Sequence, residues 1–233
     1  MVLEATTSSP SARASRRIAV IGAGVSGLSC AQGLSAAGLD VEVFDKSRGP
    51  SGRMSTRRVP ALSVQADHGA QYFTARSALF QRQAEQWLEQ GVVAAWDVVI
   101  HQVDEQGHEA GAARPPLHPR YVGSPRMSAL GRHLSAGLQL RTSVRITSVK
   151  EDRADRWWLF DEEGRKYGPY DSVMVAVPAP QAEPLLATRP RLAALAAGAR
   201  DVLLPRRRQW AHGRPARRAC LPAAGRHDRR RRG

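Results

Sequence analysis

The sequence predicts an α/β fold with a parallel sheet, and three observations near the N-terminus carry this prediction. Ile18 to Ile21 is a short apolar run, typical of a strand buried on both faces of a parallel sheet. A GxGxxG turn and a helical segment follow, and a second apolar run from Val41 to Phe44 ends on Asp45. Asp45 comes 23 residues after Gly22, near the spacing at which an acid accepts hydrogen bonds from a nucleotide ribose. The segment is therefore predicted to be a Rossmann-like dinucleotide site, and the alternative is an ordinary βαβ turn with an incidental acid.

The glycines of the turn each have a physical role in that prediction. Gly22 allows the tight turn, Gly24 lets the backbone approach a pyrophosphate, and Gly27 lets the helix pack closely on the strand. The helix is predicted from Val25 to about Ala37, and its N-terminus presents free N–H groups and a positive dipole end to phosphates.

A basic, glycine-containing loop follows Asp45 and favours FAD over NAD. A domain that binds only a nicotinamide dinucleotide needs no second loop at the pyrophosphate, although a solvated surface loop is the alternative interpretation. The loop contains Lys46, Arg48, Gly49, Gly52, Arg53 and Arg57. FAD is expected to be bound non-covalently, because no cysteine lies between Cys30 and Cys220 to form a thioether.

The remaining elements follow from periodicity and turn residues. Residues 77–90 predict an amphipathic helix whose core side chains are Leu79, Phe80, Trp87 and Leu88. Residues 91–101 are strand-like, and residues 104–119 predict a polar connection. A further helix is expected over residues 127–136, and short strands over 138–141, 145–150, 157–160 and 172–177.

Four stretches of the sequence together resemble the renalase group within the flavin amine oxidase superfamily. They are DKSRGPSGRMSTRR from Asp45, ADHGAQYFTARS from Ala66, YVGSPRMSALGRHL from Tyr121 and VMVAVPAPQ from Val173. The resemblance covers roughly residues 17–186. One departure is Ser51, which stands where the loop of that group usually has glycine.

The resemblance implies a set of FAD-binding residues. It implies that the turn of Gly22, Ala23, Gly24, Val25, Ser26 and Gly27 meets the pyrophosphate, that Asp45 meets the ribose, and that Lys46, Arg53 and Met54 lie beside them. It also implies that His68, Gly69, Ala70 and Gln71 lie near the isoalloxazine ring and that the backbone of Val144 meets the adenine. A structural, hydrogen-bonded His68 is an equally open alternative.

The activity implied by the resemblance is that of an FAD-dependent oxidoreductase. A small reduced substrate of the dihydronicotinamide type would give a hydride to the flavin, and oxygen would then accept the electrons; an amine is the alternative substrate. No catalytic acid or base is assigned, and the sequence has no metal-ligand spacing and no GxSxG motif. A hypothesis of another class is an inactive nucleotide-binding fragment.

The expected organisation is an FAD domain interrupted by a partial α+β substrate domain. The predicted boundaries are a disordered N-terminus (1–16), FAD domain (17–76 and 126–186), substrate domain (77–125), the start of a further substrate-domain segment (187–200) and a disordered basic tail (201–233). Because the sequence contains no Gly-Asp dipeptide, which closes the FAD domain in the resembled group, the chain is expected to be truncated or frameshifted after about residue 200.

Charge and composition bear on the partners. The net charge is +14, but residues 201–233 hold 11 Arg and 2 Asp and so carry +9 of it, which leaves the body mildly basic. The tail is rich in Arg, Ala, Pro and Gly and has no Lys, as out-of-frame translation of GC-rich DNA would be; an RNA-binding tail is the alternative. No apolar run approaches the ~20 residues of a membrane helix and no signal peptide is recognisable, so a cytoplasmic protein is expected.

Overall fold

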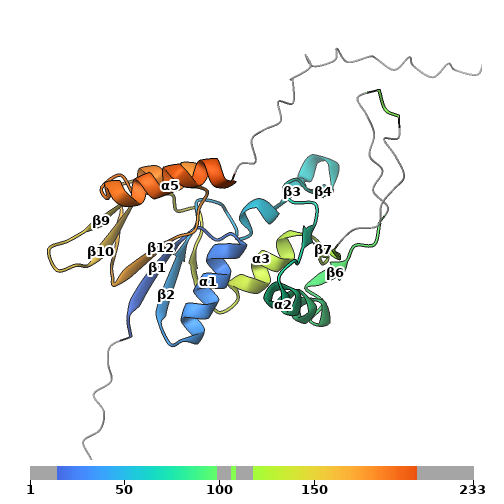
Figure 1. Ribbon diagram of the computed structural model, residues 1–233, viewed down its shortest axis with the longest axis horizontal. Coiled ribbons are helices and arrows are strands. Elements are labelled where there is room, and N and C mark those ends of the chain that lie inside the picture. The colour runs from blue at the N-terminus through green and yellow to red at the C-terminus, as the bar shows by residue number, and fades with distance from the viewer. Residues whose placement is uncertain (1–14, 99–105, 109–117, 204–233) are drawn as a thin grey trace, which may run out of the picture.

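The fold is centred on a four-stranded parallel sheet in the order β12-β1-β2-β8. The computed structural model describes residues 15–98, 106–108 and 118–203 (Figure 1). The strands are β1 (Arg17–Ile21), β2 (Asp40–Phe44), β8 (Gln139–Arg141) and β12 (Ser172–Val175). Between β1 and β2 the chain forms helix α1 (Val25–Ala36), so the predicted βαβ unit is present.

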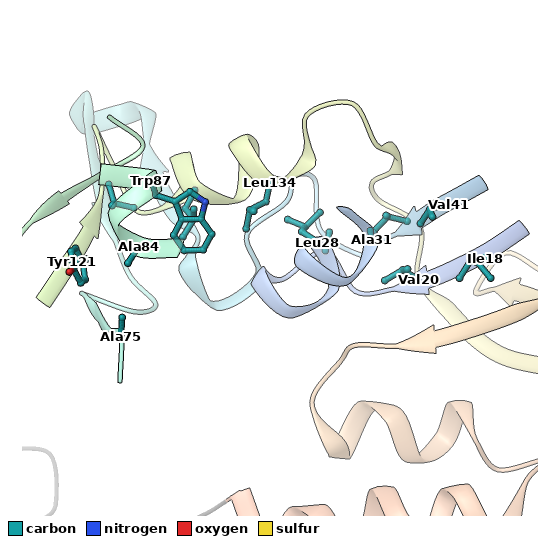
Figure 2. Packing of buried hydrophobic residues seen from close by; sticks show 14 residues of the cluster. Ile18, Val20, Leu28, Ala31, Val41, Ala75, Ala84, Trp87, Tyr121 and Leu134 are labelled. Atoms are coloured by element: carbon teal, nitrogen blue, oxygen red, sulfur yellow. The ribbon is translucent and has the colours of Figure 1, made fainter. Parts of the chain in front are cut away.

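One face of the sheet packs on helices. Ile18, Val20, Val41 and Val43 alternate along the two central strands and are 0–5% exposed, as expected of strands buried on both faces. They pack with Leu28 and Ala31 of α1 and with Leu134 of α3 (Ser128–Ser135). Figure 2 shows this core running from the sheet through α1 and α3 toward Trp87.

The other face of the sheet packs on a second, antiparallel sheet. Ala19, Ile21 and Phe44 contact residues of β9 (Ile146–Glu151), β10 (Trp157–Asp161) and β11 (Lys166–Tyr170). Helices α4 (Ala179–Leu185) and α5 (Pro190–Leu203) follow β12, with Leu185 of α4 buried in the same cluster. Strand β11 lies between the strands predicted over residues 157–160 and 172–177, where no strand was predicted. Helix α5 runs to residue 203, past the predicted start of the tail at 201.

A third layer is built on an aromatic cluster. Strands β5 (Phe73–Thr74), β7 (Arg120–Gly123) and β6 (Val93–Ala95) form a sheet in that order, and helix α2 (Ala78–Glu89) packs on it. The rings of Phe73, Phe80, Trp87 and Tyr121 lie 5.5–6.4 Å apart between centroids. Phe80 and Trp87 are core side chains as predicted, but that prediction was wrong for Leu79 and Leu88, which are 73% and 42% exposed.

A projecting hairpin completes the fold and was not foreseen. Strands β3 (Thr56–Val59) and β4 (Val64–Asp67) pair antiparallel, preceded by a short 3-10 turn, η1 (Gly52–Met54), and joined by another, η2 (Pro60–Leu62). Strand β7 leads to α3, which begins at Ser128, one residue after the start predicted for this helix.

Within the described part of the chain, no helix combines the length and the apolar character needed to cross a bilayer. The predictions for residues 1–14 and 204–233 and for most of the connection at 104–119 lie outside the described residues.

Candidate dinucleotide-binding site

The glycine turn has the shape that a phosphate-binding turn requires. Gly22 has a φ of +110°, and a Cβ there would lie 2.7 Å from the carbonyl oxygen of Ala176. A Cβ on Gly27 would lie 1.9 Å from the carbonyl oxygen of Gly22, so α1 packs directly on the turn. A Cβ on Gly24, by contrast, would meet no atom within 4 Å. The turn is therefore closed toward the protein and open at Gly24, the side on which Val25 and Ser26 begin α1.

Asp45 ties the turn to the loop that follows β2. Its Oδ2 accepts a hydrogen bond from the N–H of Ala23 at 2.7 Å, and its Oδ1 accepts one from the N–H of Ser47 at 2.7 Å. Each carboxylate oxygen has a second lone pair available for a further donor. The acid thus fixes the backbone of the turn and can still accept a hydroxyl, the group that a ribose would offer.

The basic loop meets the glycine turn, as the FAD prediction requires. The N–H of Ser51 donates to the carbonyl oxygen of Ala23 at 2.9 Å, and Ser51 forms an isolated parallel bridge with Gly24. A Cβ on Gly52 would lie 3.2 Å from the Cα of Gly24. The two glycine-containing segments therefore enclose the open position at Gly24 from two sides.

Ser51 takes an unusual backbone conformation to make this contact. Its φ is +127°, in the region that side chains rarely adopt, and it is only 1% exposed. Helix α3 makes room for it, because a Cβ on Gly131 would lie 2.1 Å from the Ser51 Oγ. Glycine, which the loop of the resembled group usually has here, would adopt this conformation without strain.

The predicted basic and apolar neighbours lie around this loop. The Lys46 Nζ donates to the Oε1 of Gln181 in α4 at 3.0 Å. Arg53 is exposed in η1, and Met54 is half-buried against the core cluster of Figure 2. The exposed guanidinium of Arg53 is thus available to an anion, whereas Met54 is a packing residue in this structure.

The segment predicted to face the isoalloxazine ring lies on the basic loop. The N–H of Ala70 donates to the carbonyl oxygen of Arg53 at 2.8 Å, and a Cβ on Gly69 would lie 2.0 Å from the same oxygen. Only glycine fits there, because the neighbour of Gly69 in this structure is the Arg53 carbonyl. The approach of this segment to the isoalloxazine ring stays a prediction. His68 and Gln71 on either side are exposed.

Val144 lies beside Asp45 at the carboxyl end of β8. Its N–H donates to the carbonyl oxygen of Asp45 at 2.9 Å, and the N–H of Ser143 donates to the carbonyl oxygen of Ser47 at 2.9 Å. Because this N–H is already used, an adenine contact at Val144 would involve its carbonyl group. The structure gathers the turn after β1, the acid after β2 and Val144 after β8 at one edge, where open α/β sheets bind their ligands.

Sequence reasoning missed a set of polar side chains that connects these parts. Thr56 is hydrogen-bonded to both Asp67 and Ser128, and the carbonyl oxygen of Ser128 accepts from Ser51. Asp67 lies in the stretch ADHGAQYFTARS, but nothing in the spacing of these residues along the sequence indicated that the β3–β4 hairpin and α3 would bring the three groups together. Among the described residues, no group of His, Cys, Asp or Glu side chains could hold a metal ion.

The residues present fit a bound dinucleotide. The space at Gly24 would admit a pyrophosphate, with the N-terminus of α1 and the exposed Arg53 as sources of positive potential. Asp45, which lies one strand away at the same sheet edge, would be the acceptor for a ribose hydroxyl.

Comparison with known proteins agrees with this geometry. Residues 20–88 match the NAD(P)-binding Rossmann-like domain family, and residues 90–202 match the family of flavin containing amine oxidoreductases. A zeta-carotene-forming phytoene desaturase from Myxococcus xanthus is 52% identical over 48 residues, which are 21% of this chain and 9% of that protein.

Solved structures share the fold at low sequence identity. Wild-type putrescine oxidase bound to putrescine has a TM-score of 0.56 and 12% identity, over 73% of this chain and 60% of that one. A protein from Photorhabdus luminescens described as an FAD containing monooxygenase has a TM-score of 0.50 and 16% identity, over 76% of this chain and 43% of that one. The chain thus spans less than two thirds of these relatives. The two matched families and the two-loop site agree with a flavin oxidoreductase fold, and the cofactor that they support is FAD.

Proposed function

We propose that the chain is a renalase-like FAD-dependent oxidoreductase that oxidises a small dihydronicotinamide-type substrate. The observation that carries the FAD part is the contact between the two glycine-containing segments. Ser51 donates to Ala23, and Gly52 packs on Gly24, so the basic loop returns to the position where a pyrophosphate would lie. A site for a nicotinamide dinucleotide alone has no need of this second segment.

The proposal gives each part of the site a task. Gly22, Gly24 and Gly27 with the N-terminus of α1 would hold the pyrophosphate, and Asp45 would hold the ribose. Arg53 would add a positive charge beside the phosphates, while residues 68–71 would lie along the ring. When bound, FAD supplies the redox chemistry, taking a hydride from the substrate and passing electrons to oxygen. The protein contributes binding, orientation and exclusion of water.

The dihydronicotinamide substrate rests on the resemblance of four sequence stretches to the renalase group. An amine substrate is the second candidate, and two findings favour it: residues 90–202 match the flavin containing amine oxidoreductases, and putrescine oxidase shares the fold. Either substrate would be oxidised by loss of a hydride, so the same FAD site serves both. The difference lies in the groups that bind the substrate.

Anaerobic reduction of the flavin tests the proposal. The purified protein is loaded with FAD and mixed in separate experiments with dihydronicotinamide isomers and with small amines, while the absorbance of the oxidised flavin is followed. We expect dihydronicotinamides to bleach the flavin faster than any amine. Faster bleaching by amines would replace the first candidate with the second, and a protein that takes up no FAD would contradict both.

The control is a variant whose fold is kept and whose pyrophosphate position is filled. Gly24→Ala places a methyl group in the open space at the turn and meets no protein atom there. Under the proposal this variant takes up less FAD and shows a correspondingly smaller absorbance change. If it were reduced as completely as the wild type, flavin uptake at this turn would be contradicted.

A further inference from the structure

A network of hydrogen bonds connects Ser51, which contacts the glycine turn, to the segment expected beside the flavin ring. It begins at Ser51, whose Oγ donates to the carbonyl oxygen of Ser128 at 3.2 Å. Ser51 is 1% exposed and Ser128 is 8% exposed, so this part of the network is buried. Ser51 is also the residue that bonds to Ala23 in the turn.

Thr56 is the centre of the network. Its Oγ1 lies 2.5 Å from Oδ1 of Asp67, 2.9 Å from the Oγ of Ser128 and 3.3 Å from the backbone nitrogen of Ser128. A hydroxyl has one proton, and the short contact to a carboxylate assigns that proton to Asp67. The Oγ and N–H of Ser128 are then both donors to Thr56. One side chain thus joins β3, β4 and the first turn of α3.

Asp67 carries the connection to the ring segment. Its other oxygen, Oδ2, accepts from the N–H of Met127 at 3.1 Å, so the carboxylate is bonded on both sides. The residues directly after it are His68 to Gln71, where Gly69 and Ala70 lie on the carbonyl oxygen of Arg53. The position of Asp67 therefore fixes where this segment leaves β4.

We propose that Thr56 is a positioning residue for the flavin half of the site. Through Asp67 and Ser128 it holds residues 68–71 at a fixed place relative to the loop at Ser51, and so sets the ring position relative to the pyrophosphate position. The inference rests on the proposed FAD site and adds a residue that was absent from its predicted binding set. In the described structure the side-chain hydrogen bonds of Thr56 go to Asp67 and Ser128, not to the turn at Gly24 or to Asp45.

The proposal predicts different effects on ADP and on FAD. ADP needs only the turn and Asp45, whereas FAD also needs the ring segment. In Thr56→Val the shape of the side chain is kept and the hydroxyl is removed, which leaves Asp67 and Ser128 without their shared partner. We expect the affinity for FAD to fall about tenfold, since three hydrogen bonds converge on this hydroxyl, and the affinity for ADP to change less than twofold.

The experiment measures FAD and ADP dissociation constants by titration calorimetry, and the visible circular dichroism that a ring held in a chiral site shows. Thr56→Ser restores the hydroxyl and should return both readouts to wild-type values. Thr188→Val is the matched control, because it removes a threonine hydroxyl that donates to the carbonyl oxygen of Val149 at 3.1 Å in another part of the protein. It should leave the ratio of the two affinities unchanged.

The outcomes separate this inference from the FAD assignment itself. Loss of FAD affinity and of the circular dichroism in Thr56→Val, with ADP binding kept, supports the positioning role. Equal loss of ADP and FAD binding, or no loss, overturns it. If Thr56→Val does not fold, Asp67→Asn provides the same test, because it weakens the hydrogen bond between Thr56 and Asp67 from the side of Asp67. If the wild-type protein bound FAD no more tightly than ADP, that result would overturn the proposed function, and this inference with it.

Discussion

Gly24 and Gly27 belong to one motif but are required for different reasons. A methyl group on Gly27 would lie 1.9 Å from the carbonyl oxygen of Gly22, so either the turn or α1 would have to move to relieve the clash. A methyl group on Gly24 would meet no protein atom, and its φ of −77° suits any residue. Gly27 is therefore required by the fold, whereas Gly24 leaves the space that the proposed pyrophosphate would occupy.

This difference predicts opposite behaviour of two alanine variants. Gly27→Ala should lower the free energy of unfolding by about 3 kcal/mol, the cost of overpacking a rigid site. Gly24→Ala should change it by less than about 1 kcal/mol, the effect of replacing glycine at a helix N-cap, yet weaken FAD binding at least tenfold. Urea unfolding and FAD titration of both variants check this. A Gly24→Ala protein with wild-type FAD affinity would contradict the assigned pyrophosphate position.

Ser51 stores backbone strain at the contact between the two loops. A residue with a side chain at a φ of +127° costs about 1–3 kcal/mol, whereas its hydrogen bond to the carbonyl oxygen of Ser128 returns about 1 kcal/mol. We therefore expect Ser51→Gly to raise the free energy of unfolding by about 1 kcal/mol. Thermal and urea unfolding measure it, and a less stable glycine variant would show that the hydrogen bond outweighs the strain.

At the scale of single elements, the turn between β10 and β11 depends on one carboxylate. Asp161 accepts hydrogen bonds from the N–H groups of Glu163 and Arg165, from the guanidinium of Arg165 and from the hydroxyl of Tyr167, at 2.7–3.0 Å. Desolvation of the side chain opposes ionisation, but these hydrogen bonds outweigh it and lower the pKa of Asp161 to about 2. The charged form is thus the one that closes the turn.

The sign of this pKa shift predicts that the turn between β10 and β11 is sensitive to acid. Because the folded pKa lies below the ordinary value of 3.8, the stabilisation is present above pH 4 and is lost as the pH falls toward 2. Asp161→Asn should be less stable than the wild type at pH 7, and the difference should shrink between pH 4 and pH 2. Thermal unfolding across this range measures the effect, and a constant difference at all pH values would contradict it.

The elements that could be predicted from sequence are those with a buried face or a clear cap. The βαβ unit of residues 17–44 could be predicted because both faces of β1 are covered. Helix α2 has a clear cap, since the Ser77 side chain accepts a hydrogen bond from the N–H of Phe80. The hairpin of β3 and β4 escaped prediction because its side chains are largely exposed and show no alternation. Strand β11 was not predicted because it contains Gly168 and Pro169, which are unfavourable in strands, although tertiary packing accommodates them here.

The same contrast holds in the site. The turn, Asp45 and the basic loop follow from local sequence, since phosphate binding depends on backbone that is close in the chain. Thr56, Asp67 and Ser128 meet across 72 residues of sequence through packing of the hairpin on α3, and no local pattern encodes that contact. The prediction that Leu79 and Leu88 are core side chains was wrong for a related reason. Helical periodicity places them on an apolar stripe, but the sheet of β5, β7 and β6 covers only the part of α2 near Phe80 and Trp87.

At the scale of the whole molecule, one continuous core joins the nucleotide-binding sheet to the layer of α2 (Figure 2). The binding edge lies at the carboxyl ends of β1, β2 and β8, with α3 and the hairpin of β3 and β4 beside it (Figure 1). Under the proposed function, the residues gathered there would contact mainly the ADP half of FAD, because His68 and Gln71 of the predicted ring segment are exposed. We therefore expect the 233-residue polypeptide to bind FAD mainly through ADP contacts and to turn over substrate slowly.

The most direct test of the central claim is a comparison of FAD and NAD⁺ binding to the wild-type chain by titration calorimetry under identical conditions. Two loops that meet at Gly24 predict one FAD per chain, bound at least tenfold more tightly than NAD⁺. Equal or tighter binding of NAD⁺ would contradict the assignment of the basic loop to an FAD pyrophosphate.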